Sequence, residues 1–335
     1  MVPHGVVLIP STYNAAHHRF TVFVAVLAFL LIVAGGLVTS NNAGLAVPDW
    51  PTSFGHLFKI PKMIGGVKFE HGHRMIAETI GLLTIICAVW TWMVDKRQWM
   101  RLLTIGAVLG VIVQGVIGGI GVILLLPPWM SALHGTFGQT MFVALGAIAV
   151  FTSRSWMDEP QDKISRKDAR PLLRHCWMLI GFLYVQLILG AAFRHVWTKW
   201  GPNGSNHWPI TRIIHTFLYP HIINALLVSV LILYVSLRTL TKHASIPQLK
   251  RPALALLLLL IVQLLLGVNA YVVRVIQGVN EAQPTMPLVV VTVTHLAVGA
   301  LILLLTAMLT IQVYRHTGDA AKVIPFDRER EVATA

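Results

Sequence analysis

Hydrophobic residues fall into eight long stretches along this chain, separated by short polar segments. Each stretch is about 20 residues or longer, the length that a helix needs to cross the hydrocarbon core of a bilayer. Backbone polar groups find no water there, so the stretches are predicted to be helices, and they lack the alternation of an outer-membrane barrel. The predicted spans are Phe20–Thr39, Met75–Val94, Leu102–Leu126, Trp129–Ser153, His175–Phe193, Ile213–Leu237, Pro252–Val273 and Met286–Tyr314.

Composition supports the same class of protein. Of the 335 residues, 56% are hydrophobic and 12% are charged, whereas a soluble domain carries about a quarter charged residues. The net charge of +13 does not indicate nucleic-acid binding, because the basic residues lie in short loops between apolar spans. The two cysteines, Cys87 and Cys176, exclude a disulfide scaffold. We therefore expect an all-α polytopic membrane protein with eight transmembrane helices.

Lysine and arginine predict the orientation of these helices. The N-terminus, the C-terminal tail and the loops after spans two, four and six hold 18 of the 26 basic residues. The positive-inside rule places these segments in the cytoplasm, so both termini are expected there. The simplest location is the bacterial inner membrane, with the long loops after spans one and five facing outward.

The chain resembles a duplication of four spans, which predicts two parallel, pseudo-repeated four-helix bundles. The predicted divisions are a first half over 1–157, a cytoplasmic linker over 158–171, a second half over 172–317 and a cytoplasmic tail over 318–335. Histidines stand at corresponding places in the even-numbered spans, and a glutamine precedes a glycine by four residues in spans three, five and seven. These residues are His73 and His221, His134 and His295, Gln114 and Gly118, Gln186 and Gly190, and Gln263 and Gly267.

The four histidines of the even spans are candidate metal ligands. All lie in the outer part of helices that run in one direction, so each half can offer two imidazoles to one iron porphyrin in an apolar cleft. Zinc would require more ligands at short range. A histidine in a span can instead hydrogen-bond between helices, although polar groups at this depth are usually functional. Other histidines are expected off this face or at the interface: His56, His71, His195, His207 and His215.

Only the first half has an acidic residue next to its first histidine. Glu70 and His73 share a helix face if the helix begins before Glu70, so one site could react while the other transfers electrons. Glu70 is alternatively an interfacial charge favoured by the helix dipole. Glu78 is expected to form an i, i+4 ion pair with Arg74 rather than to have the alternative, catalytic role.

Two segments carry a family resemblance. Residues 44–51 read Gly-Leu-Ala-Val-Pro-Asp-Trp-Pro, and residues 70–74 read Glu-His-Gly-His-Arg. Together they resemble the G-L-x-x-P-D-W-P and E-x-x-H-R signatures of the haem A synthase family, and residues 193–195, Phe-Arg-His, resemble its fifth span. Many relatives carry a cysteine pair in the first outer loop, which this chain lacks, and Thr39 stands where relatives often have an arginine.

The resemblance implies an oxidoreductase that converts haem O to haem A by oxidising the C8 methyl to a formyl through hydroxylated intermediates. It implies that His73 and His134 ligate the substrate iron, that Glu70 is the catalytic carboxylate and that His221 and His295 ligate a permanent haem B. A haem O synthase would supply the substrate, and haem B, a quinone or another partner would accept electrons. Candidate contacts for the haem propionates are Arg74, Arg194 and Arg274, which could also be interfacial side chains.

Two other classes of function stay open from the sequence. A dihaem electron-transfer protein like membrane cytochromes b explains the histidines but not Glu70 or the 44–51 segment. A transporter would need broken helices in mid-membrane, and the only sign is a glycine cluster between Gly115 and Gly121, which close helix packing explains better. The oligomeric state, a homo-oligomer included, is not determined by the sequence.

Overall fold

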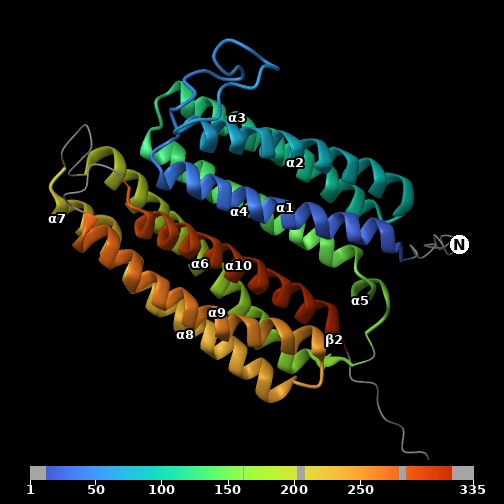
Figure 1. Ribbon diagram of the computed structural model, residues 1–335. Helices are drawn as coiled ribbons and strands as arrows, with labels where there is room; N and C mark the ends of the chain where they lie inside the picture. The colour runs from blue at the N-terminus through green and yellow to red at the C-terminus, as the bar shows by residue number, and fades with distance from the viewer. Residues whose placement is uncertain (1–12, 161, 202–207, 279–283, 319–335) are drawn as a thin grey trace, which may run out of the picture.

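The eight predicted spans are present as helices. The structure is a computed structural model that describes residues 13–160, 162–201, 208–278 and 284–318. Within these residues eight helical segments are long and apolar enough to cross a membrane. The chain is therefore an all-α, multi-pass membrane protein, and its helices run side by side in one elongated body (Figure 1).

Four helices form a ring in the first half. They are α1 (Ala15–Ser40), α2 (Val67–Val94), α3 (Gln98–Ile123) and α4 (Pro128–Thr152). Helix α1 contacts α2 and α4, and α3 contacts the same two helices from the other side. The Asn14 side chain caps α1 by accepting the His17 N–H at 3.0 Å, while α4 begins with Pro128, whose missing N–H costs nothing in a first turn.

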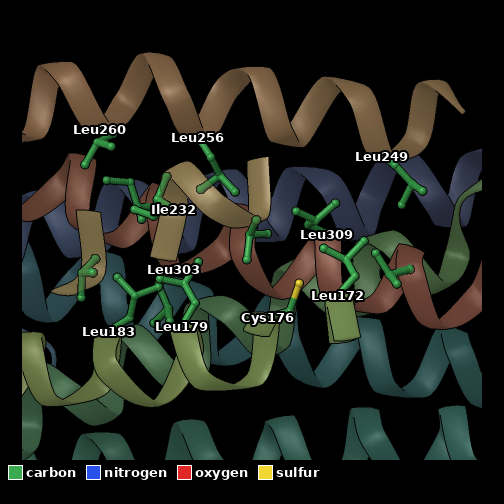
Figure 2. Close-up of a cluster of buried hydrophobic side chains, with 14 of the residues drawn as sticks. Leu172, Cys176, Leu179, Leu183, Ile232, Leu249, Leu256, Leu260, Leu303 and Leu309 are labelled. Atoms are coloured by element: carbon green, nitrogen blue, oxygen red, sulfur yellow. The ribbon is translucent and has the colours of Figure 1, made fainter. Parts of the chain in front are cut away.

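The second half is a ring of four longer spans. They are α6 (Arg166–Trp200); α7 (Ile210–Ile213), which continues through the π-helix η1 (Ile214–Leu218) into α8 (Tyr219–Lys242); α9 (Pro247–Tyr271), which continues into the π-helix η2 (Val272–Ile276); and α10 (Met286–His316). Figure 2 shows the core of this half, where leucines of α6, α9 and α10 surround Ile232 of α8. Burial of these side chains between the four helices holds the ring together.

Contacts of α4 with α6 and of α10 with α1 and α4 join the two halves. The short helix α5 (Arg154–Met157) precedes strand β1 (Ile164–Ser165), which pairs in parallel with β2 (Thr317–Gly318). In Figure 1, α5 and β2 lie at one end of the body, where α1 begins, and α7 lies at the opposite end. The latter end is the predicted outer side.

Some predicted boundaries differ from the observed ones. Helix α6 begins at Arg166, inside the predicted linker 158–171, because Ser165 caps it by accepting the Asp168 N–H at 3.2 Å. The π-helix η2 extends span seven outward to Ile276, whereas η1 lies within span six, and neither breaks its span. The predicted tail lies outside the described residues beyond Gly318, as does His207. The sequence duplication stays a prediction, although each half has a similar ring of contacts.

Candidate functional site

The four candidate ligands face one another in two pairs. His73 of α2 and His134 of α4 have ring centroids 6.4 Å apart and ring planes inclined by 67°. His221 of α8 and His295 of α10 have centroids 6.5 Å apart and planes inclined by 65°. Metal–imidazole bonds are about 2.0–2.1 Å long, so each spacing suits one metal atom between two imidazoles. The tertiary structure thus brings together the predicted partners and gives both halves the same geometry.

A glycine on the neighbouring helix makes room for each imidazole. A Cβ atom would come within 3.2 Å of His73 at Gly35 and within 2.8 Å of His134 at Gly118. It would come within 2.8 Å of His221 at Gly190 and within 3.4 Å of His295 at Gly267. We call these four residues the cradle glycines, and they explain why glycine recurs at this place in the odd-numbered spans.

Three imidazoles also meet the glutamine that stands four residues before their cradle glycine. Gln114 Nε2 lies 3.2 Å from His134 Nδ1, and Gln263 Nε2 lies 3.4 Å from His295 Nε2. Gln186 Nε2 lies 3.2 Å from His221 Nε2. These glutamines recur in the sequence as a pattern to which no role is assigned there. Their spacing from the glycines, one helical turn, was the signal that could have identified them.

Substitution of a cradle glycine tests the fit of the imidazoles. In Gly190→Ala the new Cβ would overlap the His221 ring, so the ring must move. The family resemblance implies that His221 ligates haem, and on that expectation haem retention should fall by about tenfold or more, as when other groups that position a metal ligand are lost. Haem content per purified protein measures this. The control is Gly181→Ala on the same helix, where no atom lies within 4 Å and where alanine should stabilise the helix by about 0.5–1 kcal/mol. Equal haem content in the two variants would contradict the fit.

Glu70 is buried and lies between α2 and the outer loop. Helix α2 begins at Val67, so Glu70 and His73 do share a helix face. Glu70 is 4% exposed, and its Oε1 accepts a hydrogen bond from Arg74 Nη2 at 2.7 Å. Its Oε2 accepts the Val47 N–H at 2.8 Å. Each carboxylate oxygen thus accepts one hydrogen bond, Oε1 from a charged donor and Oε2 from a neutral one.

The predicted ion pair between Glu78 and Arg74 is wrong, because Arg74 pairs with Glu70 instead. Side chains on a helix lean toward its N-terminus, so Arg74 reaches Glu70, one turn before it, rather than Glu78, one turn after it. Glu78 is exposed on the outside of α2.

The side chain of Arg74 holds the outer loop by binding main-chain carbonyl oxygens of that loop. Besides Glu70, its guanidinium donates to the carbonyl oxygens of Val47 at 3.1 Å, Asp49 at 2.7 Å and Thr52 at 3.2 Å. The two sequence signatures therefore form one structural unit: E-x-x-H-R supplies the clamp and P-D-W-P the clamped loop. A role of Arg74 in binding a propionate stays a prediction.

Asp49 shapes the turn that follows this clamp. Its carboxylate accepts the Gly55 N–H at 2.8 Å, the Thr52 hydroxyl and the Phe54 N–H at 2.7 Å. Led by the Gly55 bond, these donors lower the pKa of Asp49 from 3.8 to about 2. Because the pKa is depressed, the carboxylate supports the turn fully above pH 3.8 and loses this effect as the pH falls through about 2. The turn is thus insensitive to pH near neutrality.

Trp50, between the clamp and the turn, rests on α3. A Cβ at Gly119 would overlap its indole, and Trp50 lines an open apolar groove of about 300 Å³ together with residues of α2 and α3. Gly118 lies against His134 and Gly119 against Trp50, so two glycines of the predicted cluster make room for these side chains. They do not mark a break, because α3 is continuous over Gln98–Ile123.

Replacing Arg74 by alanine should destabilise the protein strongly. Glu70 would remain buried without its ion-pair partner, which costs about 3–5 kcal/mol, so thermal unfolding in detergent should occur at a clearly lower temperature. The control is Arg154→Ala, whose pair with Asp158 has side chains 78% and 61% exposed and should contribute about 0–1 kcal/mol. Similar unfolding temperatures for both variants would show that the clamp does not stabilise the fold.

The other two candidate arginines lie at the predicted outer ends of their helices. Arg194 of α6 donates to Ser40 Oγ at 2.6 Å, and Ser40 Oγ lies 3.1 Å from Thr292 Oγ1 of α10. Arg194 thereby links α6 to the last residue of α1. Arg274, in η2, lies within electrostatic range of Arg194, as does His195. Arg194 also lies within electrostatic range of His295, and His195 within range of His134, so these side chains lie near both histidine pairs. Contacts of Arg194 and Arg274 with propionates stay a prediction.

Comparison with known proteins agrees with the resemblance in the sequence. "Heme A synthase" of Alkalihalophilus pseudofirmus is 25% identical over 178 residues, covering 52% of this chain and 59% of the relative. "Heme A synthase" of Exiguobacterium sp. is 26% identical over 193 residues, covering 57% and 61%. That of Lysinibacillus sphaericus is 29% identical over 188 residues, covering 53% and 59%. The matched part of this chain thus spans about three-fifths of these relatives.

The family description that matches is "Cytochrome oxidase assembly protein", the COX15-CtaA family, over residues 67–279. This range runs from the first residue of α2 to just beyond η2, and it includes Glu70 and three of the four paired histidines. The chain therefore belongs to the COX15-CtaA family of cytochrome oxidase assembly proteins, as its resemblance to haem A synthases predicted.

Proposed function

We propose that this protein is a haem A synthase, an oxidoreductase that converts the C8 methyl of haem O into a formyl through hydroxylated intermediates. The proposal rests on two imidazole pairs of equal spacing. In only one of them is a histidine, His73, preceded on the same helix by a buried carboxylate, that of Glu70. Equal pairs suit two iron porphyrins, and the unequal surroundings suit one reacting and one resident haem. The names of the relatives support the same activity.

The second pair would hold the resident haem B. His221 and His295 come from two helices of one ring, and the cradle glycines Gly190 and Gly267 leave the space that their rings need. Among the described residues no third histidine, cysteine or carboxylate joins either pair to form a larger metal-binding group. Two imidazoles from facing helices are a donor set with which proteins hold haem. Haem B would supply one-electron transfer when it is bound.

The first pair would hold the substrate. His73 and His134 would take the iron of haem O between them, and the apolar tail of the substrate would remain in the hydrocarbon. Glu70, one turn before His73, would assist removal of a proton or stabilise positive charge at the reacting carbon. Its bonds to Arg74 and the Val47 N–H hold the carboxylate in place.

The site also implies partners. The substrate would come from a haem O synthase in the same bilayer, and electrons from the methyl group would pass to haem B or to an external acceptor such as a quinone. We place the protein in the bacterial inner membrane with both termini in the cytoplasm, because most basic residues lie on that side. Both histidine pairs then lie near the outer surface.

Haem analysis of the purified protein tests the proposal. The full chain is produced with and without a haem O source, and the bound haems are extracted and separated by chromatography. Haem B together with haem O or haem A is the expected result, and haem A should form only when haem O is supplied. Haem B alone under both conditions would indicate an electron-transfer cytochrome, and protein without haem would indicate a transporter.

A further inference from the structure

An open apolar groove of about 300 Å³ lies between α2 and α3. Its α2 wall consists of Gly81 and Ile85, its α3 wall lies within Val108–Val116, and Trp50 of the outer loop completes the lining. Ile85 and Ile112 of the lining are exposed, so the groove opens toward the bilayer. Because these lining residues include no charged group, the groove suits an apolar ligand.

The groove begins at the depth of the first imidazole pair. Gly118 lies against the His134 ring, and Gly119 lies against Trp50, which lines the groove. Gly115, one turn before these two glycines, is itself a lining residue. From this level the lining residues of α3 extend toward the predicted cytoplasmic side for about 15 Å, the rise of roughly ten helical residues.

Two glycines create space in this groove. A Cβ at Gly115 would meet no described atom within 4 Å, and a Cβ at Gly81 would meet only Val111 Cγ1 among the described atoms, at 3.8 Å. Side chains at these two positions would therefore extend into the groove rather than into a neighbouring helix. Close packing explains Gly118 and Gly119, which lie against rings, but it does not explain Gly115.

The corresponding positions of the second half carry larger side chains. The residue after the glutamine that meets an imidazole is Gly115 in α3 but Leu264 in α9. The residue eight positions after the first histidine is Gly81 in α2 but Ser229 in α8. The two halves thus hold their imidazoles at the same spacing but differ in the space beside them, which indicates that the two pairs take ligands of different shape.

We propose that this groove receives the apolar tail of haem O and that Gly81 and Gly115 are the residues that admit it. This rests on the proposed function, in which the first pair holds haem O and the second holds haem B, which has no such tail. Lipid chains are as apolar as the groove, so the groove contributes close van der Waals contact along the tail. It also fixes the direction of the attached porphyrin, and direction matters because the reaction oxidises one methyl group of the ring.

The test fills the groove from either wall. Gly115→Leu and Gly81→Leu are produced as full chains without a haem O source, and haem O is then titrated into the purified proteins while the absorption spectrum is followed. The dissociation constant of haem O should rise by about tenfold or more in each variant, because one methylene group too many for an apolar pocket already changes relative binding by about 10–200-fold. The content of resident haem B should stay unchanged.

Gly106→Leu is the matched control for these variants. Gly106 is exposed on the same helix as Gly115, and a Cβ there also meets no described atom within 4 Å, but Gly106 does not line the groove. Its haem O affinity should equal that of the wild type.

The outcomes separate this inference from the proposed function. Equal haem O affinity in Gly115→Leu, Gly81→Leu and Gly106→Leu, with haem B retained, would overturn the groove as the site of the tail and would leave it to a lipid chain. Loss of resident haem B in the two groove variants would contradict a groove that serves the first pair alone. Wild-type protein that binds neither haem would overturn the proposed function and this inference together.

Discussion

Replacing Glu70 by glutamine should lower haem A formation by about 10²–10⁴-fold, the usual contribution of a general acid or base, while both haem sites still fill. Glutamine has nearly the same shape and can still accept the Val47 N–H, but it carries no charge and takes up no proton. The measurement is the amount of haem O and haem A extracted from membranes that also contain a haem O source, together with the total haem bound by the purified variant.

Two further variants make this result specific. Glu78→Gln makes the same change on the exposed side of the same helix and should leave product formation unchanged. Arg74→Ala removes the clamp on the outer loop, so a comparison of its product yield with that of Glu70→Gln separates loop order from chemistry. Normal haem A yield in Glu70→Gln would remove Glu70 from the reaction.

Replacing His221 or His295 by alanine should abolish retention of haem B. Loss of a histidine that would hold the haem should lower haem affinity by more than the roughly 10–100-fold that a group positioning a ligand contributes. His73→Ala should have the complementary effect, lowering the binding of haem O while haem B stays. The measurements are the absorption spectrum of the purified protein and chromatography of its extracted haems.

His215→Ala is the matched control for these ligand variants. His215 lies in η1, six residues before His221; it is exposed, and its ring packs at a tilt against Tyr219 with centroids 5.1 Å apart. It should leave haem content unchanged. A full absorption spectrum after replacement of both His221 and His295 would refute the assignment of the second pair.

The candidate site was partly predictable because helices and ligand pairs leave a periodic signal. The spacing of Glu70 and His73 placed them on one helix face, and the recurrence of histidine in the even-numbered spans indicated the pairs that the structure brings together. Both signals depend only on the helical period and on parallel helices. The glutamine and glycine pattern was equally visible, but its role required knowing which ring lies against which glycine.

The sequence by itself determined the number of spans, the all-helical class and the candidate ligands, because the bilayer requires long apolar helices and makes buried polar side chains rare. Only the tertiary structure decided that Arg74 pairs with Glu70 and clamps the 44–51 segment, and that Trp50 rests on Gly119. It also decided that Arg194 reaches Ser40 across 154 residues. Such contacts depend on the path of a loop outside the hydrocarbon and on the direction of individual side chains, and neither has a period that a sequence can reveal.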